Sequence, residues 1–133
     1  MSTLKVTNIQ ATGETASRAV SGVAAAWVNY YHISGTPTAQ NSMNVSSLTD
    51  VGTGRVSINI TNNMANVNYA GAGLAGHDSG TGSSGKTAQL DRQGSLPFAV
   101  GAVQVQTVYD PTASISDVIN DSRATFIFHG DLA

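Results

Sequence analysis

The sharpest chemical pattern in the chain is GTGSSGKT at residues 80–87. It satisfies the P-loop formula, in which backbone N–H groups surround phosphates, Lys86 contacts the terminal phosphates and Thr87 binds Mg²⁺. A P-loop must follow a buried parallel strand and open a helix. Here the motif follows GLAGHDS, which does not read as a strand, and Gly94 and Pro97 come too soon after it for the supporting helix. The context therefore predicts a flexible loop with no bound nucleotide.

Three histidines are the candidate metal ligands: His32, His77 and His129. A zinc site needs three or four converging ligands, and no third partner stands near the pairs that His77 and His129 form with neighbouring aspartates. One histidine from each subunit could still meet its copies on the axis of a trimer. The alternative is a solvated or hydrogen-bonded imidazole, which backbone groups satisfy easily. We therefore expect no metal and no other cofactor.

Hydrolytic chemistry has little support in the sequence. No G-x-S-x-G nucleophile motif is present, and Glu14 is the only glutamate. The aspartates stand singly in predicted turns, where the side chain usually forms hydrogen bonds with nearby backbone groups. A glycosidase needs two carboxylates about 5–10 Å apart, which this chain could supply only across a subunit interface. The expectation is a protein without catalytic residues.

Aromatic side chains are the remaining candidates for ligand contact. Trp27, Tyr30 and Tyr31 stand close together, and aromatic faces suit carbohydrate and cations. A large aromatic residue such as Trp27 is expected in the core. Tyr31, or the hydroxyl of Tyr30 at a strand end, is therefore the predicted ligand-binding group.

These side chains must be held by strands, and residues 43–73 show the clearest strand pattern. Val56, Ile58 and Ile60 alternate with polar residues, which predicts a half-buried strand. Leu48 is out of phase with the preceding apolar residues, so we expect a β-bulge near residues 46–47. Turn residues at 50–54 and 62–66, followed by Val67 and a tyrosine, predict a three-stranded meander.

The flanking sequence predicts further strands. Residues 23–33 are apolar on both faces, so both faces should be covered, by a second sheet or a neighbouring subunit. Residues 34–38 and 71–86 are expected as loops, and 87–92 as a short strand or a helical turn. Residues 3–9, 98–109 and 124–130 are expected strands, with a polar connection and a possible short helix between the last two. About eight strands predict an all-β single domain over residues 1–133, an antiparallel sandwich or jelly-roll-like fold.

Composition excludes several classes of function. Charged residues make up 11% of the chain, against roughly 25% in ordinary domains, and the net charge is −2. No basic run is present, so no nucleic-acid partner is expected. Cysteine is absent, which excludes disulfides and thiolate metal sites. No apolar run suits a signal peptide or a membrane span, so we expect synthesis in a cytoplasm and no membrane insertion.

An ordered series of residues resembles a module of phage tail-fibre and related virion proteins. That module has AWV-N, then NVSS-(aliphatic)-T-x-x-GTG, an alternating strand, and a Met- and Asn-containing turn leading to an aliphatic-Tyr strand. The match covers about a third of the chain. Two departures are Tyr30-Tyr31-His32 in place of an aromatic-Asn-Gly turn and the absence of Pro after Met64, and residues 74–133 match loosely. The matching residues are Ala26-Trp27-Val28-Asn29, Asn44-Val45-Ser46-Ser47-Leu48-Thr49, Gly52-Thr53-Gly54, Val56, Ile58, Ile60, Met64, Asn66 and Tyr69.

The resemblance implies a non-enzymatic structural protein of the virion, made in the host cytoplasm. We expect a homotrimer that belongs to a tail fibre or similar appendage, contacts other virion proteins and touches the host surface, where a glycan is a possible partner. The alternatives are a capsid decoration or cement protein and a free carbohydrate-binding module.

Overall fold

The computed structural model describes residues 8–9, 18–19, 24–77, 87–90, 98–108 and 122–133. The described part of the chain consists of strands, turns and irregular links, without a helix. The eleven strands are β1 (Asn8–Ile9), β2 (Arg18–Ala19), β3 (Ala24–Ile33), β4 (Thr36–Met43), β5 (Val45–Gly52), β6 (Arg55–Ile60), β7 (Ala70–His77), β8 (Thr87–Leu90), β9 (Phe98–Ala99), β10 (Ala102–Val108) and β11 (Ser122–His129).

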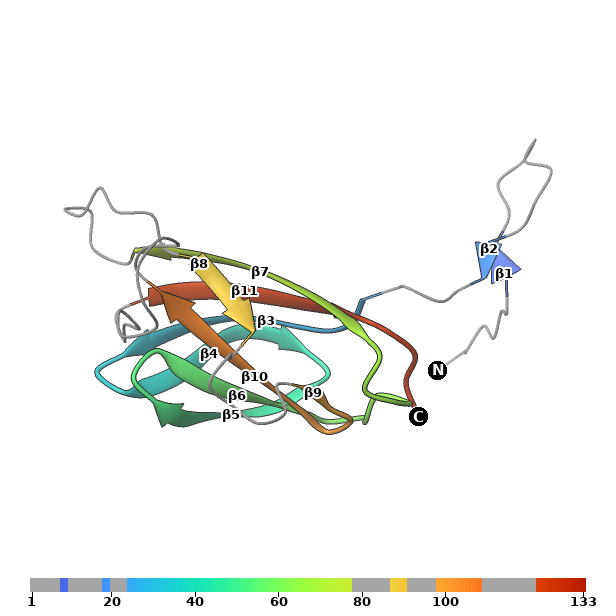
Figure 1. The fold of residues 1–133 in the computed structure, drawn as a ribbon, viewed down its shortest axis with the longest axis horizontal. Helices are drawn as coiled ribbons and strands as arrows, with labels where there is room; N and C mark the ends of the chain where they lie inside the picture. Colours follow the sequence, from blue (N-terminus) through green and yellow to red (C-terminus); the bar gives the residue numbers. More distant parts are fainter. Residues whose placement is uncertain (1–7, 10–17, 20–23, 78–86, 91–97, 109–121) are drawn as a thin grey trace.

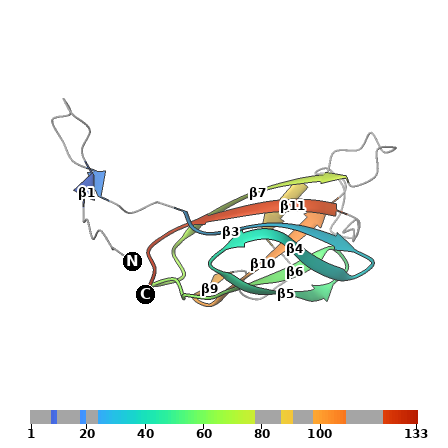
Figure 2. The same ribbon diagram turned by 180° about the vertical axis from the view of Figure 1, so that it is seen from behind.

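Nine of these strands form two antiparallel sheets that pack face to face (Figures 1 and 2). One sheet has the order β4-β3-β11-β7, and the other has the order β5-β6-β10-β8, with β9 paired to β10. β1 and β2 pair with each other in a separate two-stranded ribbon. The predicted all-β antiparallel sandwich is therefore confirmed.

The core lies between the sheets and follows the alternation of each strand. Ile58, at the centre of β6, is fully buried and lies in register with Val103 of β10. From the other sheet, β11 contributes Phe126 and Phe128, whose rings are stacked 6.3 Å apart. Side chains on one face of each of the central strands thus fill the interior, as the period of two requires. The predicted bulge is also present, as a register shift in β5 between Val45 and Ser47.

Strand β4 was not predicted, because residues 34–38 were expected to be a loop. The chain reverses within two residues, Ser34 and Gly35, which have φ angles of 50° and 78°. Positive φ at both positions is the geometry of a tight hairpin turn, so β4 begins at once. β4 is an edge strand with mostly exposed polar side chains, and Pro37 is tolerated there. Such a strand has no apolar alternation by which the sequence could reveal it.

The predicted run at residues 98–109 is split in two. Val100 and Gly101 form a turn, so Phe98 and Ala99 fold back on β10 as the short strand β9. Val103 and Val105 of β10, two residues apart, both point into the core. The predicted connection at 110–122, with its possible helix, falls mainly outside the described residues.

Strand β7 corrects two predictions. The third strand of the meander was expected at Val67 and Tyr69, and a loop was expected from residue 71. Instead Val67 is exposed in an irregular link, and β7 begins at Ala70 and joins the other sheet beside β11. The glycines of β7 lack side chains of their own to bury. Phe128 and Phe126 of β11 lie directly opposite Gly71 and Gly73, and their rings cover these two residues.

The close approach at Gly73 makes a testable prediction. A Cβ at this position would lie 2.5 Å from Cδ1 of the buried Phe126, so Gly73→Ala should lower the free energy of unfolding by about 1–3 kcal/mol through overpacking. Gly76, in the same strand, faces open space, and Gly76→Ala is the matched control. Urea melts of both variants measure the difference. Equal stability of the two variants would contradict the packing of Phe126 over β7.

Asn44 forms the corner at which the chain passes from β4 in one sheet to β5 in the other. Its φ angle is 57°, in the left-handed region. Its Nδ2 donates to the carbonyls of Ala25 and Asn62, at 3.0 and 3.1 Å. Its Oδ1 accepts from the backbone N–H of Asn62 at 2.7 Å. One carboxamide therefore connects β3, the corner and the link after β6.

Tyr69 anchors the link that leads into β7. Its hydroxyl donates to the carbonyl oxygens of Ala99, at 2.9 Å, and Ala102, at 3.3 Å. Its ring meets Phe98 edge-on, with centroids 4.7 Å apart. Burial raises the pKa of Tyr69 to about 12, so the hydroxyl stays protonated and able to donate near neutral pH.

Candidate functional site

Tyr30, one of the two predicted ligand-binding residues, lies in the core and not at the surface. Its side chain is fully buried, and its ring stacks on Phe126 with centroids 6.4 Å apart. The hydroxyl lies near the Thr107 hydroxyl, and burial raises the pKa of Tyr30 above its ordinary value of 10.0. The prediction placed this hydroxyl at an accessible strand end. Its burial leaves it no surface on which to contact a ligand.

Tyr31 lies on the opposite, outward face of β3 and is half-buried. The guanidinium carbon of Arg123 lies 4.3 Å from the centre of its ring, in a cation–π contact. The two residues are paired in the β3–β11 register. One face of the Tyr31 ring is thus already covered by a cation of the same chain.

Trp27 also lies on this outward face, which corrects the expectation that it belongs to the core. Both faces of β3 are apolar in sequence, so the alternation alone could not tell which of them points inward. The smaller residues Ala26 and Val28, together with Tyr30, take the inward positions. Trp27 is only half-buried. The sequence predicts that both faces of β3 need a cover. The second sheet covers the inward face.

We call the outward side of the β4-β3-β11-β7 sheet the apolar outer face. The strand register places Met43, Trp27, Ile127 and Ala72 in one row across its four strands. A neighbouring row holds Asn41, Asn29, Thr125 and Leu74, and the next includes the Tyr31–Arg123 pair. Leu74 is 80% exposed, and Met43 and Ile33 are 40% and 43% exposed. Met43 lies directly beside the half-buried Trp27, and Leu74 and Ile33 lie farther away on the same face.

The outward side of the β5-β6-β10-β8 sheet has the opposite character. Its register rows contain Ser47 beside Asn59, and Thr49 beside Ser57 and Gln104. Asn59 Nδ2 donates to the hydroxyls of Ser47 and Thr49, both at 3.0 Å. Asn59, Ser47 and Thr49 thus satisfy one another near the surface, and Ser57 is buried. The sandwich therefore has one polar and one apolar outer face.

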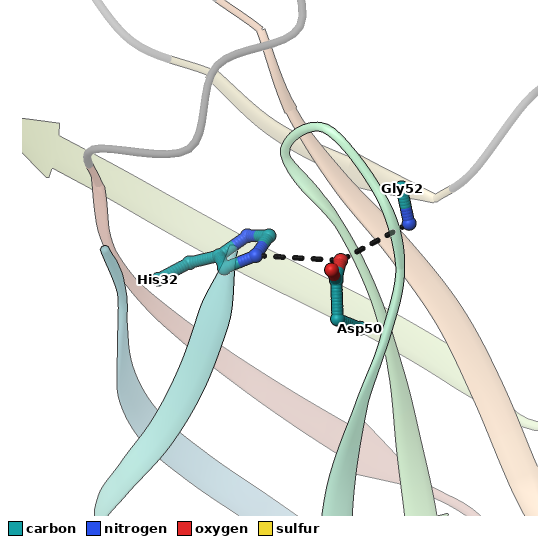
Figure 3. Close-up of polar contacts among 3 residues, drawn as sticks. All are labelled: His32, Asp50 and Gly52. Carbon is teal, nitrogen blue, oxygen red and sulfur yellow. Dashed lines mark hydrogen bonds and ion pairs between the residues drawn. The ribbon is translucent and has the colours of Figure 1, made fainter. Parts of the chain in front are cut away.

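His32 forms the other notable group, at the end of β3 (Figure 3). It is fully buried, and its Nε2 lies 3.5 Å from Oδ1 of Asp50 in β5. The same carboxylate oxygen accepts a hydrogen bond from the backbone N–H of Gly52 at 3.0 Å. The pair links the two sheets at one end of the sandwich. A buried imidazole cannot meet a substrate from solvent, so the arrangement indicates a structural contact.

Among the described residues, no cluster of three or more His, Asp, Glu or Cys side chains is placed to hold a metal ion. His32 is buried inside one chain, so it cannot meet its copies on a symmetry axis. His129 is partly exposed at the end of β11. The side chain of His77 lies outside the described part of the structure.

Residues 80–86 of the P-loop pattern also lie outside the described residues. Its last residue, Thr87, begins strand β8, which pairs with β10. A P-loop opens a helix at this point, so the described end of the motif has the wrong secondary structure for phosphate binding.

Within the described ranges, no helix has the length and hydropathy needed to cross a membrane. No protein-family model matches the chain, and neither a curated protein nor a solved structure matches it. The functional argument therefore depends on the chain's own residues.

Proposed function

We propose that the chain is a non-enzymatic structural protein of a phage virion, within a tail fibre or similar appendage that contacts the host surface. The proposal includes assembly as a homotrimer and contact with other virion proteins. One observation carries the proposal. In the stretch from Ala26 to Tyr69, a series of residues resembles, in the same order, a module of phage appendage proteins. An antiparallel sandwich with few charged residues and an uncovered apolar face supports it, because such a subunit suits permanent assembly.

The positions of the resembling residues support a structural role for the pattern. Asn44 holds the corner between the sheets, Ile58 fills the core, and Tyr69 anchors the link before β7. None of these three residues presents a reactive group to solvent in a way that suggests catalysis. The pattern therefore describes how this sandwich is built, which is the property expected of a virion component.

The alternative is a capsid decoration protein, to which the same architecture is suited. A free carbohydrate-binding module is less well supported, because Arg123 covers one face of Tyr31 and Tyr30 is buried. Host-surface glycan remains a proposed partner of the assembled appendage, to be bound elsewhere than at the Tyr30 hydroxyl.

Immunogold electron microscopy of the parent particle tests the proposal. Antibodies against the full chain should label the tail or its fibres, and they should not label tailless heads. Uniform labelling of the head shell, with a fixed number of copies for each capsid, would instead show that the chain is a capsid decoration protein. Particles that carry no label, from a lysate in which the chain is abundant, would refute a virion role altogether.

A further inference from the structure

The two outer faces of the sandwich differ in a way that requires a cause. On the outward side of β5 and β6, Ser47, Thr49 and Asn59 are polar and hydrogen-bonded among themselves. On the apolar outer face, Met43 exposes a large hydrophobic side chain beside Trp27, and Leu74 and Ile33 expose theirs elsewhere on the same face. Since both faces belong to one small fold, the fold itself does not explain the difference. An apolar patch of this kind marks an interaction site.

The charge pattern of the apolar outer face fits a protein partner of the same kind. Neither β3 nor β4 contains a Lys, Arg, Asp or Glu. Among the described outward side chains of β11, Arg123 carries a full charge, and its guanidinium lies over Tyr31. Interface centres are depleted in Lys, Glu and Asp and enriched in Trp, Tyr, Met and Arg. A second copy would bring no carboxylate that must be buried, and its Asn and Thr side chains can pair with their equivalents.

The size of this face suits an interface between copies. Four strands about 4.8 Å apart and about eight residues long, at about 3.3 Å per residue, give a plane of roughly 500 Å². Two such faces together would bury about 1,000 Å², which is near the lower limit for a specific interface. Apolar residues occur on both halves, with Trp27 and Met43 on β3 and β4, and Ile127 and Leu74 on β11 and β7. The whole face can therefore meet that of a second copy.

A sugar is a poorer fit to the same residues. Stacking on a pyranose requires open aromatic faces, and Arg123 already lies over the ring of Tyr31. Leu74, Met43 and Ile127 offer no hydrogen bonds to hydroxyl groups, and on this face such groups come from the neighbouring Asn29, Asn41 and Thr125.

We propose that the apolar outer face, centred on Trp27, Met43, Ile127 and Leu74, binds a second copy of this chain. The inference adds a surface to the assembly described under the proposed function. The proposed interface and the proposed virion role can fail independently, because a protein outside any particle could also assemble through this face.

Sedimentation velocity of the full chain, from about 1 to about 100 µM, tests the proposal. The unchanged chain should sediment as an oligomer of defined stoichiometry. Leu74→Glu should raise the dissociation constant about 100-fold or more, because each subunit would bury an unpaired carboxylate. Met43→Glu should act in the same direction. Val67→Glu is the matched control, since Val67 is an exposed apolar residue outside both sheets, and it should change the dissociation constant less than about 3-fold.

Circular dichroism of each variant verifies that the sandwich is intact, which the high exposure of Leu74 leads us to expect. A monomeric unchanged chain at the highest concentration would overturn the proposal. So would dissociation by Val67→Glu without dissociation by Leu74→Glu. A monomer that binds oligosaccharides and loses them on Trp27→Ala would make the face a glycan site, and the proposal would then be wrong.

Discussion

Ile58→Ala is expected to lower the free energy of unfolding by about 2–5 kcal/mol. Ile58 is fully buried in β6, an interior strand of its sheet, and lies between Leu48 of β5 and Val103 of β10. Truncation to alanine removes apolar contacts and leaves a cavity that two neighbouring strands cannot close without shifting. Urea melts at one fixed protein concentration measure the loss, because the stability of an oligomer depends on concentration.

Asn59→Ala is the neighbouring control, and we expect it to cost under about 1 kcal/mol. Asn59 points to the opposite side of β6, where its exposed hydrogen bonds to Ser47 and Thr49 can be replaced by water. A loss at Asn59 as large as that at Ile58 would mean that the two faces of β6 are exchanged.

Asn44→Ala is expected to cost about 2–4 kcal/mol, a large effect for a polar residue outside the core. Two terms contribute. Alanine in the left-handed region is strained by about 1 kcal/mol or more, and the carboxamide's hydrogen bonds contribute about 0.5–1.5 kcal/mol each. The carbonyl of Ala25 also loses the Asn44 amide, at a site that is partly buried. Thermal and urea melts provide the measurement.

Two further variants at this position separate the terms. Asn44→Gly removes the side chain but accepts the positive φ angle, so it should recover about 1 kcal/mol relative to alanine. Asn44→Asp keeps an acceptor for the N–H of Asn62, but it places a carboxylate oxygen against the carbonyls of Ala25 and Asn62. We expect it to be no better than alanine. If Asn44→Ala melts within about 0.5 kcal/mol of the unchanged chain, the corner does not depend on this residue.

The sequence predicted those strands in which one face is apolar and the other polar. β6 and β11 belong to this group, and Ile58, on the apolar face predicted for its strand, is buried. The bulge in β5 was predictable as well, because Leu48 breaks the alternation that begins before it. In these strands a shift of one residue would expose the whole apolar set, so the pattern determines the register.

The edge strands β4 and β7 could not be predicted in this way. β4 exposes polar side chains, and β7 is rich in Gly and Ala, so neither shows a period of two. Their positions depend on partners far away in sequence. Gly73, for example, is a strand residue because Phe126 of β11 covers it. Local propensity contains no information of that kind.

The candidate interface was only partly visible in the sequence. The apolar character of both faces of β3 was clear, and it led to the expectation of a second cover. The inward face could not be chosen, which is why Tyr30 was predicted as a ligand contact and Trp27 as a core residue. Leu74 joins Trp27 on one surface only through the register of β11 with its two neighbours. The His32–Asp50 contact similarly depends on the packing of one sheet against the other.

The pairing of β3 with β11 has a consequence for how the chain reaches its native state. Trp27 lies beside Ile127, so the first and last strands of the sandwich are neighbours in the middle of one sheet. Closing so long a loop costs entropy before any contact is gained, and β proteins with such distant pairings fold in about milliseconds to seconds. β3 cannot find its partner until the ribosome has released β11. Until then the row of Ala26, Val28 and Tyr30 lacks its neighbour, so the sandwich can close only after β11 has been synthesised.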